Sequence, residues 1–88
     1  MTLDVTNFGE ILMSRPAGKE AFSMAKAYIF NKLSPTEILT LDFKNVKVFA
    51  PSWADEFITS VKSSYPNKIE CINTQNESVS QSLKFVQL

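Results

Sequence analysis

The segment Glu37–Phe43 places the strongest constraint on the fold, because apolar residues occupy most of its positions. Leu39, Leu41 and Phe43 alternate on one face of a strand, and Ile38 adds an apolar side chain to the other face. A strand that is apolar on both faces is typical of the interior of a sheet that is covered on both sides. We therefore expect an interior, doubly covered strand at this point of the chain.

Helical patterns lie on both sides of this segment. Apolar residues recur at three- and four-residue spacing before it, which predicts a helix from about Pro16 to Asn31 that Ser34 and Pro35 end. A second helix is predicted after it, beginning near Ser52 and ending at about Ser64. The apolar positions of the two stripes are Ala21, Phe22, Ala25, Tyr28, Ile29 and Leu33 in the first, and Trp53, Ala54, Phe57, Ile58, Val61 and Tyr65 in the second.

Shorter patterns complete the predicted fold. Leu3–Val5, Val46–Phe49 and Lys68–Asn73 have the composition of short strands, and a third helix is expected from Asn76 to the C-terminus. The resulting order is β-α-β-(β)-α-β-α, which is typical of an α/β domain. We predict a single domain over residues 1–88, with a mixed sheet of about four strands packed against helices.

Composition limits the chemistry that the chain can perform. The 88 residues include no histidine and one cysteine, and 9 Lys and Arg balance 9 Asp and Glu. Without histidine, the usual general base and the commonest metal ligand are missing. We expect no enzyme activity, no metal, no cofactor and no disulfide. The neutral charge argues against nucleic acid, and no apolar stretch is long enough for a membrane span, so a cytoplasmic protein is expected.

Two motifs carry a resemblance to a known family. Leu41-Asp42-Phe43-Lys44-Asn45-Val46 is followed by Phe49-Ala50-Pro51-Ser52-Trp53-Ala54-Asp55-Glu56-Phe57, and Ser14-Arg15-Pro16-Ala17-Gly18 precedes both. In these segments the chain resembles a bacterial STAS-like domain of unknown function, from roughly Phe8 to Val86. STAS domains include the anti-sigma factor antagonists.

The resemblance implies a role in protein interaction, with a histidine-kinase-like ATPase or an anti-sigma-type regulator as the partner. In the antagonists, a serine at the start of the corresponding helix is phosphorylated and the added charge blocks docking. This chain has Ala50 and Pro51 where the antagonists have the aspartate and that serine. Ser52 is the nearest hydroxyl that a kinase could modify. The binding surface implied by the resemblance consists of Phe49, Pro51, Ser52, Trp53 and Glu56.

Several of these residues have two interpretations. Ser52 is either a phosphorylation site or the N-cap of the helix, with Asp55 completing a capping box. Trp53 either anchors a partner or continues the apolar stripe into the core. Arg15, the only arginine, either forms an internal clamp with Asp42, Asp55 or Glu56, or faces a carboxylate of a partner.

Three functions are consistent with the sequence. The leading hypothesis is a small regulatory interaction module that acts through residues 49–56. The first alternative is a domain that senses an anion or nucleotide at the start of the second helix. The second alternative is a structural subunit that associates with itself, with a homodimer as its simplest form.

Overall fold

The computed structural model describes residues 1–88 and contains three helices and five short strands. Two of the helices, α1 and α2, are fourteen residues long, and none of the helices has the length and apolar character needed to cross a membrane. The elements in chain order are β1 (Thr2–Asp4), the 3-10 helix η1 (Val5–Phe8), β2 (Ile11–Leu12), α1 (Arg15–Tyr28), the 3-10 helix η2 (Phe30–Lys32), β3 (Leu39–Asp42), β4 (Val48–Phe49), α2 (Pro51–Ser64), β5 (Ile69–Ile72) and α3 (Glu77–Phe85).

The strands form two parallel sheets in place of the single mixed sheet that the sequence predicts. A three-stranded sheet has the order β1-β3-β5, and a two-stranded sheet pairs β2 with β4. The same two chain segments lie side by side in both sheets, since β2 follows β1 and β4 follows β3. The 3-10 helix η1 interrupts one segment and the turn at Lys44 and Asn45 interrupts the other. These interruptions explain why the predicted four-stranded sheet is wrong.

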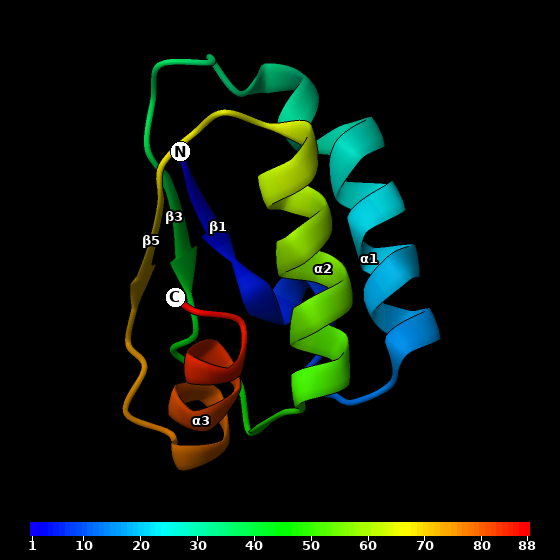
Figure 1. The fold of residues 1–88 in the computed structure, drawn as a ribbon, viewed down its shortest axis with the longest axis vertical. Coiled ribbons are helices and arrows are strands. Elements are labelled where there is room, and N and C mark those ends of the chain that lie inside the picture. Colours follow the sequence, from blue (N-terminus) through cyan, green and yellow to red (C-terminus); the bar gives the residue numbers. More distant parts are fainter.

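The two long helices, α1 and α2, lie on the same face of the β1-β3-β5 sheet (Figure 1). The chain crosses from β1 to β3 through α1 and from β3 to β5 through α2, always in the same direction along the sheet. Right-handed crossovers in one direction place their helices on the same face. The side chains of Leu39 and Leu41 are therefore buried, whereas Thr40 and Asp42 on the other face are half-buried. The expectation that both faces of this strand are covered is wrong.

The core fills the space between the sheets and the helices. Aromatic rings form its centre: Trp53 stacks on Phe57 with ring centroids 4.9 Å apart, and Phe49 lies 5.5 Å from Trp53. Aromatic pairs at these distances add stabilisation beyond the burial of their area. The first turn of α2 is thereby fixed in the core.

The helices begin close to the predicted positions; α2 also ends as predicted at Ser64, whereas α1 and α3 end earlier than predicted. Ser14 caps α1, because its hydroxyl accepts a hydrogen bond from the Ala17 N–H at 3.2 Å. This helix ends at Tyr28, three residues before the predicted end at Asn31, and the chain continues into the 3-10 helix η2. Asn76 caps α3 as predicted, by accepting a hydrogen bond from the Val79 N–H.

Candidate functional site

The start of α2 differs from the predicted capping box. Ala50 is the N-cap and makes no side-chain hydrogen bond, Pro51 is the first helical residue, and Ser52 already lies within the first turn. Proline fits this position because its missing N–H would have no partner in the helix. The Ser52 hydroxyl instead donates a hydrogen bond of 3.1 Å to the carbonyl of Met13. The prediction that Ser52 is the N-cap is therefore wrong.

The two large aromatic residues of the predicted binding surface are in the core. Phe49 and Trp53 are each 1% exposed. A partner cannot contact side chains that are this deeply buried without unfolding the start of α2. These two residues therefore hold the start of α2 in place from within the core. Their predicted role as contact residues is wrong.

Three of the predicted contact residues remain accessible. Pro51 is exposed, and Ser52 and Glu56 are half-buried. Ser52 and Glu56 are four residues apart on α2 and so lie on the same side of the helix. These residues define the part of the predicted surface that a partner can reach.

Arg15 joins the first turn of α1 to the second turn of α2 by two ion pairs. Its guanidinium lies 2.8 Å from the Asp55 carboxylate and 3.3 Å from the Glu56 carboxylate. The hydrogen bonds to these carboxylates raise the pKa of Arg15, and the bonds from Arg15 and the Thr59 hydroxyl lower the pKa of Asp55. These contacts have the form of the internal clamp that the sequence predicts for Arg15 and Asp55.

Asp42 does not belong to this clamp. Its carboxylate accepts hydrogen bonds from the Lys44 N–H at 3.0 Å and from the Asn73 side-chain amide at 2.9 Å. These contacts lie at the end of β3, where they fix the turn that follows the strand and join it to the segment after β5. Its predicted role in holding Arg15 is wrong.

The apolar residues beside the start of α2 were not predicted from the sequence as part of the site. Ile11 is 63% exposed and Met13 is 55% exposed, whereas Leu12 between them is buried. The hydrogen bond from Ser52 to the Met13 carbonyl attaches this strand to α2. Three apolar residues in a row show no alternation, so the period-2 pattern that identifies a half-buried strand is absent. The sequence feature that could have indicated this surface is the run of three apolar residues, Ile11, Leu12 and Met13.

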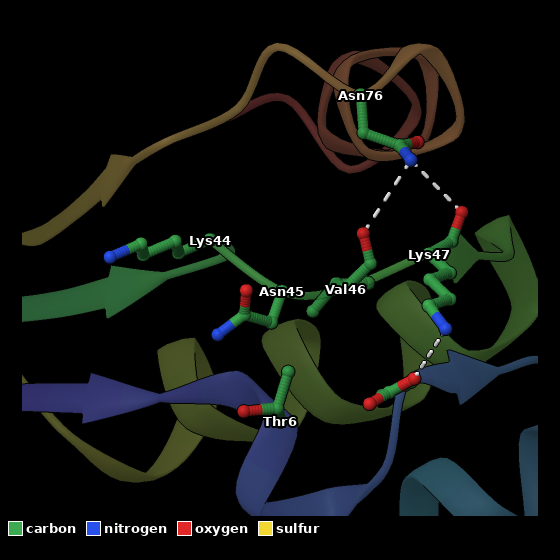
Figure 2. A pocket seen from close by; sticks show the side chains of 7 residues that line it. Thr6, Lys44, Asn45, Val46, Lys47 and Asn76 are labelled. Atoms are coloured by element: carbon green, nitrogen blue, oxygen red, sulfur yellow. Dashed lines mark hydrogen bonds and ion pairs between the residues drawn. The ribbon is translucent and has the colours of Figure 1, made fainter.

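A hollow of about 590 Å³ lies where both segments of the sheet are interrupted (Figure 2). It sits beyond the carboxyl ends of β1 and β3, which is the edge at which parallel sheets bind ligands. Glu10 at its rim pairs with Lys47 at 3.0 Å, and Lys44 makes no ion pair. The hollow is lined by Thr6, Glu10, Lys44, Asn45, Val46, Lys47 and Asn76.

The only cysteine, Cys71 in β5, lies away from the start of α2 and from the hollow. Burial in the sheet raises the pKa of the Cys71 thiol to about 11. A thiol with this pKa is almost entirely protonated near neutral pH and is a poor nucleophile. No group of three or more acidic or cysteine side chains is arranged to hold a metal ion.

Comparison with known families identifies the fold type. A model of the STAS-like domain of unknown function, DUF4325, matches residues 25–79, more than half of the chain. The chain belongs to this family. Both motifs that suggested the resemblance, at 41–46 and 49–57, lie inside the matched range of the STAS-like domain, whereas the segment Ser14–Gly18 lies before it. No curated protein and no solved structure matches this STAS-like domain.

Proposed function

We propose that this STAS-like domain is a regulatory interaction module that binds another protein through β2 and the start of α2. The observation that carries the proposal is the pair of exposed apolar side chains, Ile11 and Met13, beside the exposed Pro51. Exposed apolar side chains that lie together are typical of protein interaction sites. The hydrogen bond from Ser52 to Met13 keeps the two parts of the surface in one arrangement.

The proposed partner is a regulator of the histidine-kinase-like ATPase or anti-sigma type. Membership of the STAS-like family and the resemblance to the anti-sigma factor antagonists support this class of partner. Phosphorylation of Ser52 would regulate binding within this proposal, because a phosphorylated hydroxyl can no longer donate to the Met13 carbonyl. The added charge would also lie beside two exposed apolar side chains, where it opposes an apolar contact.

An affinity capture experiment tests the proposal. Tagged wild-type protein and the Ile11→Lys variant are used as baits in lysate of the source organism, and bound proteins are quantified by mass spectrometry. Phe85→Lys is the matched control, because Phe85 is also 63% exposed but lies on α3. We expect one regulator to bind wild type and the control and to lose at least about tenfold in recovery with Ile11→Lys, which corresponds to about 1.4 kcal/mol. Equal recovery by all three baits would contradict the proposed surface.

A second candidate function is supported by the hollow beyond β1 and β3. Lys44 has no carboxylate partner, whereas Lys47 is paired with Glu10, so an anionic small molecule would find one unpaired cation, Lys44, at the hollow. Binding would raise the melting temperature as ligand is added. Melting in phosphate and in chloride at equal ionic strength, for wild type and Lys44→Ala, tests this candidate. A rise specific to phosphate that is lost in the variant supports it, and identical melting in both salts opposes it.

A further inference from the structure

The rest of the fold covers one edge of the β2-β4 sheet and leaves the other edge uncovered. In this parallel pair the N–H groups of Val48 and Ala50 donate to the carbonyls of Glu10 and Leu12. Because successive backbone groups of a strand point to opposite sides, the N–H and C=O of Phe49 point away from β2. These outward-pointing groups of Phe49 lie on the outer side of β4, which forms one edge of the sheet.

Side chains of α3 cover this edge of β4. The Phe49 N–H donates to the Ser78 hydroxyl at 3.1 Å, and the Phe49 carbonyl accepts a hydrogen bond from the Ser82 hydroxyl at 2.5 Å. The side-chain amide of Asn76 donates to the Lys47 carbonyl at 2.9 Å. The backbone groups of this edge are therefore satisfied within the chain.

The β2 edge has no such cover. By the same alternation, the N–H and C=O of Ile11 and the N–H of Met13 point away from β4. Met13 uses its carbonyl to accept the Ser52 hydroxyl. The side chains along this edge are the exposed Ile11 and Met13, and neither is a charged residue or a proline of the kind that protects free edges in other proteins.

We propose that β2 pairs in antiparallel fashion with β2 of a second copy of this chain. Ile11 presents one donor and one acceptor on the same side, so a two-fold axis beside it satisfies both groups with those of Ile11 in the second copy. The exposed side chains of Ile11 and Met13 in the two copies then cover one another. The pairing needs no second type of edge strand, because β2 pairs with the same strand of the other copy.

The geometry of the β2-β4 sheet also limits pairing through β2 to two copies. The β2 strands meet at the centre, and each outer edge is a β4 strand that α3 already covers. The pairing therefore closes with a sheet of the order β4-β2-β2-β4. Because β2 is only two residues long, the buried area is small, and we expect a weak dimer, in the class of interfaces that bury less than about 1,200 Å² in total.

Sedimentation of the protein alone, from about 5 µM to 1 mM, tests this dimer. Wild type and Phe85→Lys are expected to shift from monomer to dimer with rising concentration. Ile11→Lys is expected to weaken the dimer at least about tenfold, since it places two ammonium groups across the two-fold axis. Ile11→Pro removes only the outward N–H and leaves the bonds to β4 intact, so it should weaken the dimer in the same way.

Hydrogen exchange locates the interface independently of mass. The Ile11 and Met13 amides should exchange rapidly in dilute wild-type protein and more slowly at high concentration. Circular dichroism melting of each variant confirms that it is folded. A wild-type monomer throughout the range overturns the proposal, as does a dimer that both Ile11 variants retain. Ile11 and Met13 also belong to the surface proposed for the regulator, so the second copy and the regulator would compete for it. The experiment tests the dimer alone, because no second protein is present.

Discussion

Gly18 of α1 lies against the backbone of Trp53 in α2, so closely that a Cβ atom at position 18 would stand 2.8 Å from the Trp53 carbonyl oxygen. The same Cβ would lie 3.2 Å from the Trp53 Cα. Both neighbours are backbone atoms, which cannot move aside as a flexible side chain can. The absence of a side chain at this position lets the two helices pack together at the point where Arg15 joins them.

The first prediction concerns this helix contact. Gly18→Ala should destabilise the fold by about 1 to 3 kcal/mol, because the helices must separate or shift to admit the methyl group. On an exposed helix the substitution would have the opposite sign, since alanine has the higher helix propensity. Urea denaturation measures the effect, with Ser23→Ala at an exposed position of α1 as the control. A variant that is more stable than wild type would contradict the close contact.

The second prediction concerns Trp53 itself. Because Trp53 is 1% exposed and stacks on Phe57, Trp53→Ala should cost about 3 to 5 kcal/mol of folding free energy. In a small domain this loss is a large part of the total stability. Trp53→Phe should cost much less, because one ring still fills the site. Denaturation curves of the two variants provide the measurement, and an undiminished midpoint for Trp53→Ala would show that the indole is not a core residue.

The third prediction concerns the buried hydroxyl of Ser82. Its hydrogen bond satisfies the Phe49 carbonyl at the covered edge of β4. Ser82→Ala leaves that carbonyl without its partner and should cost about 1 to 3 kcal/mol. Ser80 lies on the same helix, is half-buried and makes no side-chain hydrogen bond, so Ser80→Ala is the matched control. Equal denaturation midpoints for the two variants would rule out this role for Ser82.

The fourth prediction concerns the pH dependence of the Arg15 ion pairs. The pKa of Asp55 is lowered in the folded state, first by its hydrogen bond from Arg15. A carboxyl group with a lowered folded pKa contributes stability above its unfolded pKa of about 3.9, and this contribution is lost as the pH falls through the folded pKa.

The difference in melting temperature between wild type and Asp55→Asn should therefore be present at pH 7 and shrink below about pH 4. The effect should be small and reduced by salt, because the pair is exposed. Glu20→Gln replaces an exposed carboxylate of α1 that forms no ion pair and serves as the control. A difference that stays constant from pH 7 to pH 2 would show that the ion pair contributes no stability.

The elements that follow strong periodic patterns could be predicted from the sequence. The apolar stripe of α2 and its end at Ser64 agree with the structure, as does the Asn76 cap of α3. These features depend on local spacing and capping, which a sequence displays directly. The family was also recognisable from the motifs at 41–46 and 49–57.

The arrangement of the sheet depends on non-local contacts and could not be predicted in the same way. The helices cover only one face of β3 because both crossovers run in the same direction along the sheet. The residues of β3 do not indicate that direction. The pairing of β2 with β4 joins residues far apart in the chain through only two residues on each strand. The exposed surface at Ile11 and Met13 therefore became visible only once the fold was known.

Site-specific photocrosslinking in cells of the source organism tests the central claim, that β2 and the start of α2 form the partner surface. A photoreactive amino acid replaces Met13 in one strain and Phe85 in another, and the crosslinked products are identified by mass spectrometry. We expect position 13 to yield an adduct with one regulatory protein and position 85 to yield none. An adduct formed from position 85 alone would contradict the proposed surface.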